Sequence, residues 1–247
     1  MNYRDILYKD YSSHFEKPRE VADSVQFDLF ETIYPKDSLP SGLIVDLACG
    51  RGAWLRWMHK RGAKKLAGVD LSKSDLAVVA LPECELLNQD IFQFLEKDPR
   101  LFSMIHAKDV IEHFTKDEVV RFLTLCRGRL EPGGILWIST FNALAPLAAQ
   151  TWRGDFTHEM AFTPGSMKQV LRACGFSESV VTCCHPVPNS AKGWMRSLLL
   201  RPVIAACRLA ANLRYGFSPD NQCGPSLLAF ARKEPVGDNK AAYGSVA

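Results

Sequence analysis

Several absences narrow the class of protein. The eight cysteines include no C-x-x-C pair, and some lie inside apolar runs such as VVTCC. They are typical of buried, reduced thiols, so we expect a cytosolic protein rather than a disulfide scaffold. No run reaches the roughly 18 apolar residues of a membrane-spanning helix, and MNYRDILYKDYSSHF lacks the apolar core of a signal peptide. The formal net charge of +3 is too small to indicate nucleic-acid binding.

The sequence also has no internal repeat, so its organisation is inferred from length, composition and breaks. Its 247 residues, of which 47% are hydrophobic and 23% charged, suit one medium domain with an insertion. The segment YPKDSLPSG interrupts the pattern just before residue 43. We therefore expect an N-terminal helical cap over residues 1–40, a main domain over 41–234 and a flexible tail over 235–247.

The main domain alternates strand-like and helical segments. We expect strands at residues 43–47, 64–70, 84–90, 102–107 and 134–140. Helices are expected at 53–59, at 72–80, and from the capping box of Thr115 and Glu118 to the break EPGG. A helix from Pro164 to Gly175 and strands at 176–184 and 226–233 follow. This alternation predicts a parallel α/β sheet with right-handed crossovers.

A glycine-rich turn follows the first expected strand. In IVDLACGRG, Gly50 and Gly52 stand between an apolar strand and a helix, where the backbone can approach a ligand closely. The dinucleotide pattern G-x-G-x-x-G is absent, because Ala48 takes the first glycine position and Leu55 the last. A nicotinamide-dependent oxidoreductase is therefore disfavoured.

Acidic residues accompany three successive strands. Asp46 lies in the first strand, Asp70 closes the second, and Asp90 follows the third. Ligands of open α/β sheets lie across the carboxyl ends of the strands. Asp70 is then placed to accept both hydroxyls of a ribose, Asp90 an exocyclic amine, and Asp46 an ammonium group directly or through water. Together they predict a nucleoside joined to an amino acid, without phosphates.

The segments DLACGRG, GVDLS, NQDIF, HAKDVIEHF and LEPGGILWIST resemble the motifs of the class I S-adenosylmethionine (SAM)-dependent methyltransferases. The resemblance implies a Rossmann-like sheet of seven strands, the last antiparallel, with helices on both faces. It also places Gly50 and Gly52 at the methionine part of SAM and Asp70 at the ribose. Further cofactor contacts are implied for Leu71, Asp90, Ile91 and Ala107. Ala48 departs from the glycine that is usual in this family.

The stretch KDVIEHF follows the fourth strand and should line the acceptor side of this site. If it forms one helical turn, Asp109, Glu112 and His113 share a face. His113 could then be a general base that takes a hydroxyl proton. Alternatively, these residues could bind a divalent cation together with His158 of WRGDFTHEMAFTP. A purely structural role is the third possibility.

The pattern D-x-x-E-H with a later histidine looks like the two-acid, two-histidine metal site of small-RNA 3′-terminal methyltransferases. It is also similar to the E-x-x-E-H segment of ubiquinone-pathway O-methyltransferases. The resemblance implies Asp109, Glu112, His113 and His158 as metal ligands, with His113 and His158 also as catalytic residues. Asp109 is shorter than the usual glutamate. Such a ligand set would suit Mg²⁺, Mn²⁺ or Zn²⁺.

An insertion at residues 185–225 is basic and apolar. No aspartate or glutamate occurs from Ser179 to Pro219, whereas the same stretch carries Lys192, Arg196, Arg201, Arg208 and Arg214. Pro202 is expected to split the insertion into two helices, and the basic positions do not share one helical face. The insertion could be a solvated cap, or it could contact an anionic substrate or, through residues 192–216, the inner face of a membrane. Together with D-x-x-E-H and the loop THEMAFTP, the insertion resembles methyltransferases of bacterial surface-polysaccharide and glycolipid pathways.

These features predict a cytoplasmic SAM-dependent O-methyltransferase that acts on a hydroxyl of a sugar or glycan. The alternative acceptor is a small phenolic or lipid-like metabolite. RNA is disfavoured by the modest charge and by the lack of a recognisable RNA-binding module. A SAM-binding regulatory protein without catalysis is the alternative from another class.

Overall fold

The computed structural model describes residues 39–185, 188 and 190–235, together with Leu7, Phe27, Phe30 and Glu31. The predicted N-terminal cap and the predicted tail therefore fall largely outside the described residues. The four isolated residues are helical, and Phe30 is 1% exposed in the core beside the sheet. At least this part of the first 40 residues thus packs against the main domain.

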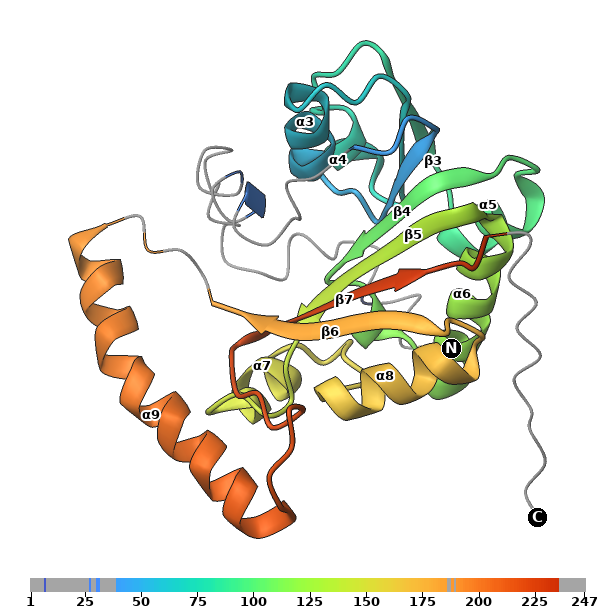
Figure 1. The fold of residues 1–247 in the computed structure, drawn as a ribbon. Helices are drawn as coiled ribbons and strands as arrows, with labels where there is room; N and C mark the ends of the chain where they lie inside the picture. Colours follow the sequence, from blue (N-terminus) through green and yellow to red (C-terminus); the bar gives the residue numbers. More distant parts are fainter. Residues whose placement is uncertain are drawn as a thin grey trace, which may run out of the picture.

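One seven-stranded sheet forms the centre of the molecule (Figure 1). Its strands are β1 (Ile44–Leu47), β2 (Leu66–Asp70), β3 (Cys84–Asn88), β4 (Phe102–Lys108), β5 (Leu130–Phe141), β6 (Glu178–Cys184) and β7 (Ser226–Arg232). The strand order is β3-β2-β1-β4-β5-β7-β6. Only the pairs β5–β7 and β6–β7 are antiparallel. The predicted Rossmann-like sheet with an antiparallel last strand is confirmed.

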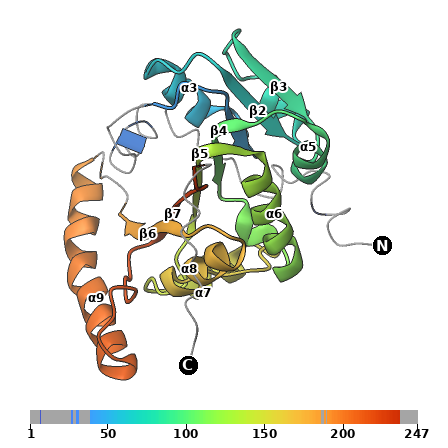
Figure 2. The ribbon, with the colours of Figure 1, turned by 45° about the vertical axis from the view of Figure 1, so that its right-hand side comes forward.

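Helices cover both faces of the sheet (Figure 2). The first face carries α5 (Ile91–Lys97), α6 (Lys116–Arg129) and α8 (Pro164–Ala173), whose apolar side chains share a core with Val45 and Leu47 of β1. The opposite face carries α3 (Ala53–Lys60) and α4 (Lys73–Leu76), which pack near Ile44. Alternate residues of β1 thus point into separate cores, as the two-residue period of a strand requires.

Two local differences from the expected elements have clear physical reasons. Helix α4 ends at Leu76, not at residue 80, and Val79 then packs over the glycine turn, where a Cβ on Gly52 would lie 2.7 Å from its Cγ1. Strand β5 begins at Leu130, so EPGG lies inside the strand and not between elements. The register between β4 and β5 shifts between Phe102 and Met104, and this irregularity accommodates the extra residues of EPGG in β5.

The insertion forms one continuous helix, α9 (Ala191–Tyr215), with Pro202 inside it. The prediction of two helices split at Pro202 is therefore wrong. A proline in a helix interior removes one hydrogen bond, which frees the carbonyl four residues earlier. That residue is Leu198, which is 66% exposed, so water can reach the freed carbonyl. Within the described residues, no helix is both long and apolar enough to cross a membrane.

Candidate functional site

The turn between β1 and α3 holds an unusual backbone. Ala48, Gly50 and Gly52 all have positive φ, at 58°, 51° and 73°. Glycine adopts this conformation without strain, whereas a side chain at Ala48 costs free energy. A Cβ on Gly50 would meet no atom within 4 Å, so open space lies over this residue. The turn therefore offers a bare backbone surface that a ligand can approach.

Asp70 ties this turn to the end of β2. Its Oδ2 accepts the Gly50 N–H at 2.7 Å, and its Oδ1 accepts the Ser72 N–H at 2.7 Å. Burial raises the pKa of Asp70, although these two backbone donors act in the opposite direction. Beside it, the Leu71 side chain is 62% exposed at the same edge of the sheet. Both residues thus lie at the carboxyl edge of the sheet, beside the glycine turn.

Asp90 serves as the N-cap of α5. Its Oδ1 accepts the N–H groups of Phe92 and Gln93, both at 3.0 Å. Asp90 therefore caps α5 through Oδ1. Within the part of the chain described here, Oδ2 of Asp90 accepts no hydrogen bond. Ile91 is only 7% exposed, so little of its side chain can touch a ligand.

Asp46 points away from the open turn and into a buried pair. Its Oδ1 lies 2.6 Å from Nδ1 of His106, and both side chains are almost fully buried. The His106 ring stacks on Trp54 with centroids 4.0 Å apart. The next residue, Ala107, is 0% exposed at the end of β4. The sequence analysis missed His106, although it faces Asp46 across the parallel strands β1 and β4.

The stretch KDVIEHF does not form one continuous helical turn. Asp109 has a φ of 50°, and the short 3₁₀ helix η2 (Ile111–His113) begins only two residues later. The Asp109 side chain is 56% exposed and contacts the ammonium group of Lys108. The expected shared face therefore includes Glu112 and His113 but not Asp109.

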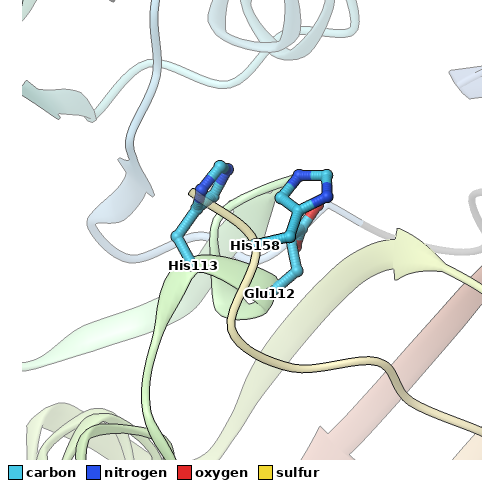
Figure 3. A group of neighbouring side chains, drawn as sticks. All are labelled: Glu112, His113 and His158. Carbon is cyan, nitrogen blue, oxygen red and sulfur yellow. The ribbon is translucent and has the colours of Figure 1, made fainter. Parts of the chain in front are cut away.

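Glu112, His113 and His158 come together (Figure 3). One potential ligand atom from each lies within 4.8 Å of the others. Glu112 is 3% exposed and accepts a hydrogen bond from Thr140 Oγ1 at 2.8 Å. The two histidine rings lie 4.7 Å apart. Three of the four predicted metal ligands thus converge.

Backbone hydrogen bonds hold the loop that carries His158 in place. The carbonyl oxygen of Glu112 accepts the N–H groups of Glu159 at 2.8 Å and Met160 at 2.9 Å. This loop follows α7 (Ala148–Gly154), and the His158 ring stacks on Phe141 at the end of β5. Residues far apart in the sequence are thereby joined at the carboxyl edge of the sheet.

A chain of hydrogen bonds determines which ring nitrogen of His113 carries the proton. Thr157 Oγ1 donates to Asp155 Oδ1 at 2.7 Å, since a carboxylate can only accept. Thr157 Oγ1 also lies 2.9 Å from His113 Nδ1, which must then be the donor. In the neutral ring the lone pair is therefore on Nε2. The sequence analysis noted Asp155 beside His158 but gave Thr157 no role.

His158 has the same tautomer for a similar reason. Its Nδ1 lies 3.2 Å from the carbonyl oxygen of Thr151, which can only accept. The lone pair of the neutral His158 ring is therefore on Nε2, as in His113. Hydrogen bonds of this kind orient imidazoles that bind metals, and they also orient imidazoles that take protons.

Burial shifts the pKa values of this cluster in opposite directions for the acid and the imidazole. Burial, followed by the nearby Asp109 carboxylate, raises the pKa of Glu112 to about 7. Burial, followed by His158, lowers the pKa of His113 to about 4. At neutral pH His113 is thus neutral and able to accept a proton, while Glu112 lies close to its titration point.

A hollow of about 290 Å³ borders the cluster. It is lined by Trp152, Arg153, Asp155, Phe156, His158 and Glu159. His158 and Asp155 belong both to this hollow and to the hydrogen-bonded cluster. A larger hollow of about 440 Å³ lies over α8 and Asp220, away from the cluster. The smaller hollow is therefore the one that chemistry at His113 and His158 could use.

The comparisons with known proteins identify the family of this chain. A family model described as "Methyltransferase domain" matches residues 14–179. The ubiquinone biosynthesis O-methyltransferase of Bradyrhizobium sp. (strain ORS 278) is 34% identical over 148 residues, which are 53% of this chain and 57% of that protein. Its counterpart in Coxiella burnetii (strain Dugway 5J108-111) is 33% identical over 105 residues, or 40% and 43% of the two chains. The chain thus spans only about half the length of these curated relatives.

Solved structures show the same fold at low sequence identity. A SAM-dependent methyltransferase from Archaeoglobus fulgidus matches with a TM-score of 0.63 and 15% identity, covering 92% of this chain and 99% of that one. The Haemonchus contortus phosphoethanolamine N-methyltransferase 2 in complex with SAM matches with a TM-score of 0.58 and 14% identity, covering 95% and 60%. The predicted enzyme class is confirmed at the level of the family: this chain belongs to the methyltransferase domain family and has the fold of the SAM-dependent methyltransferases.

Proposed function

We propose that this protein transfers the methyl group of SAM to a hydroxyl oxygen of a small aromatic or lipid-like molecule. The observation that carries the proposal is the convergence of Glu112, His113 and His158 beside a hollow whose lining includes Trp152 and Phe156. The names of the curated relatives favour a small-molecule acceptor. This acceptor replaces the sugar or glycan that the sequence suggested.

The open glycine turn is the cofactor site in this proposal. Gly50 leaves space for the methionine part of SAM, and Asp70 holds the turn while it offers its remaining lone pairs to the ribose. The adenine would bind at the same edge of the sheet, beside the exposed Leu71 and the Oδ2 atom of Asp90, which takes no part in capping α5. Asp46 has a buried partner in His106, so any contact with the ammonium group needs a water or a shifted side chain.

His113 acts as the general base. Its Nδ1–H is held by Thr157, so the Nε2 lone pair takes the proton of the acceptor hydroxyl. SAM supplies a methyl group on a sulfonium, and formation of the oxygen–methyl bond as the methyl–sulfur bond breaks leaves S-adenosylhomocysteine. A low pKa keeps His113 neutral, and thus competent, at any pH above about 4.

A divalent cation would suit the same residues. A buried carboxylate and two imidazoles with lone pairs on Nε2 form a three-ligand set, and catalytic metal sites with three protein ligands keep a further position open for substrate. Such an ion would lower the pKa of a bound hydroxyl, and adjacent hydroxyls on the acceptor could both coordinate it. Asp109 lies outside this set and would contribute its charge only from a distance.

Binding and turnover measurements test the cofactor site separately from the catalytic cluster. We expect Asp70→Ala to abolish SAM binding by calorimetry, whereas Asp117→Ala on the exposed surface of α6 should leave it unchanged. Unaltered affinity in the Asp70 variant would remove the cofactor assignment. Circular dichroism of both variants controls for unfolding.

Replacing His113 or His158 by alanine should spare SAM binding and lower turnover about a hundredfold or more on a panel of hydroxylated aromatic acceptors. Methyl gain measured by mass spectrometry gives the readout. Tight SAM binding with no turnover on any acceptor would instead favour a regulatory protein without catalysis.

The pH dependence of turnover separates the two mechanisms. If His113 acts alone, the rate should be nearly constant between about pH 5 and 8, because its pKa is about 4. If a cation held by ionised Glu112 is required, the rate should fall on acidification from a metal-free pKa of about 7, and added cation should move the inflection to lower pH because it competes with the proton. EDTA should abolish turnover in the second case only.

A further inference from the structure

Helix α9 presents an unusually large apolar surface to solvent. None of its residues is buried, and both views show it at the edge of the molecule, apart from α5 and α6 (Figures 1 and 2). Its exposed apolar side chains include several that are more than half accessible. These are Trp194, Met195, Leu198, Leu199, Leu200, Leu209 and Leu213. Exposed apolar surface of this extent usually marks an interaction site.

Most of these exposed apolar residues form one stripe along the helix. Its members share one side of the helix at 3.6 residues per turn and are 54–73% exposed: Trp194, Met195, Leu198, Leu199, Leu209 and Leu213. We call this face the outer stripe. The opposite side carries small residues such as Gly193, Ser197, Cys207 and Ala211, which are partly covered. The outer stripe therefore faces away from the body of the protein.

Basic residues flank the outer stripe on both edges. At 3.6 residues per turn, Lys192, Arg196 and Arg214 fall along one edge, and Arg201 and Arg208 along the other. The five basic positions thus do not share one helical face, as expected from the sequence, and they lie on both sides of the apolar face. Within the described residues none of the five forms an ion pair. No acidic residue occurs from Ser179 to Pro219 to neutralise them.

We propose that α9 docks on the surface of an anionic lipid bilayer through the outer stripe. Apolar side chains would enter the boundary between headgroups and acyl chains, while the flanking guanidinium groups reach the lipid phosphates. Aromatic residues lie near both helix ends, with Trp194 58%, Tyr215 80% and Phe217 84% exposed, as suits the polar–apolar interface.

The charge distribution favours lipid over a second copy of this chain. If two α9 helices paired through their outer stripes, ten basic side chains would lie around one contact, and α9 supplies no carboxylate to balance them. An anionic surface instead complements all five charges of one helix at once. This inference does not depend on the acceptor proposed above, because binding can be measured without turnover.

Vesicle co-sedimentation of the full chain tests the proposal. We expect binding to phosphatidylcholine vesicles that contain about 30% phosphatidylglycerol, and little binding to phosphatidylcholine alone. Raising the salt from about 0.05 M to 0.5 M should weaken the binding. Equal binding to both vesicle types, or none to either, would overturn the proposal.

Matched variants separate the two parts of the surface from overall charge. Changing Arg196, Arg201, Arg208 and Arg214 to glutamine should lower the partition coefficient by at least about tenfold. The control changes four exposed lysines elsewhere to glutamine, namely Lys64, Lys65, Lys97 and Lys116. If the control loses as much binding as the arginine variant, non-specific charge would explain the result.

The orientation of the helix has its own readout. Trp194 should shift its fluorescence to shorter wavelength on anionic vesicles, and the shift should vanish in Trp194→Phe while binding persists. The double variant Leu198→Asp, Leu209→Asp should lose binding. Light scattering that shows a dimer disrupted by these aspartates, with no vesicle binding of the wild type, would assign the stripe to a second copy instead.

Discussion

At the scale of single residues, the site depends on side chains that act through others. Asp70 positions the glycine turn by accepting the Gly50 N–H, and Thr157 fixes the tautomer of His113 while Asp155 holds the hydroxyl. In the proposed mechanism, Thr157 and Asp155 therefore determine which nitrogen of His113 takes the proton.

Thr157→Val should remove the hydrogen bond to His113 while it preserves the size of a side chain that is 3% exposed. We expect kcat to fall about tenfold or more with little change in SAM affinity, because either nitrogen of His113 can then carry the proton. Thr157→Ser retains the hydroxyl and should restore most of the rate. Similar loss in both variants would indicate that Thr157 contributes only packing.

Ala48→Gly should stabilise the protein. Ala48 has a left-handed backbone that costs an alanine about 1–2 kcal/mol, and this exceeds the extra entropy that a glycine loses on folding. We expect a gain of about 0.5 kcal/mol in the free energy of unfolding, measured with urea. A loss of stability would show that the methyl group of Ala48 makes a compensating contact.

At the scale of elements, η2, which carries Glu112 and His113, leads directly into a capped helix. Phe114 alone separates His113 from Thr115, whose side chain accepts the Glu118 N–H as part of a capping box. Glu118 completes the box through its bond to the Thr115 N–H at 2.8 Å. The first turn of α6 therefore anchors the C-terminal side of η2.

Thr115→Ala should lower the free energy of unfolding by about 1 kcal/mol, because the Glu118 N–H loses its side-chain acceptor and the Glu118 carboxylate loses the hydroxyl of Thr115. Thr124→Ala on the exposed side of the same helix is the control, and it should be neutral or slightly stabilising. Thermal unfolding measures both. Equal effects of the two substitutions would argue against the capping role.

At the scale of the whole molecule, the catalytic cluster should make stability depend on pH in the metal-free protein. The folded pKa of Glu112 is about 7, above its unfolded value, so the folded state is destabilised as pH rises toward 7. The folded pKa of His113 is about 4, below its unfolded value, so its contribution to stability increases as pH rises from about 4 to 6.5.

Glu112→Gln removes the first of these two effects. We expect the variant to exceed the wild type in stability by roughly 1–3 kcal/mol at pH 8 and to differ little at pH 4.5, as measured with urea in the presence of EDTA. The Glu96→Gln substitution on the exposed surface is the control. An advantage that was the same at both pH values would contradict the raised pKa of Glu112.

The sequence predicted those features of the whole molecule that depend on local patterns. Alternating strands and helices indicated the sheet, which the structure confirms, whereas the role of the glycine turn and Asp70 as the cofactor site stays a prediction. Features that depend on strand register or on loop paths were missed, as the pairing of Asp46 with His106 and the contact of Thr157 with His113 show. Asp109 was assigned to the cluster because a helical turn was assumed, whereas its positive φ directs the chain away from that geometry.

The position of α9 in the chain also indicates that this helix could be replaced without loss of the sheet. Cys184 and Ser226 are paired neighbours at the ends of β6 and β7, so the chain leaves and re-enters the sheet at adjacent points. In folding thermodynamics, the residues between them are a long hairpin loop, whose closure entropy grows only with the logarithm of its length. The segment from 220 to 224 is tied to the body, since Asn142 donates to the carbonyl oxygens of Gln222 and Gly224. A tight turn in place of residues 186–217 should therefore leave a folded domain, which makes α9 an exchangeable module grafted onto a fixed scaffold.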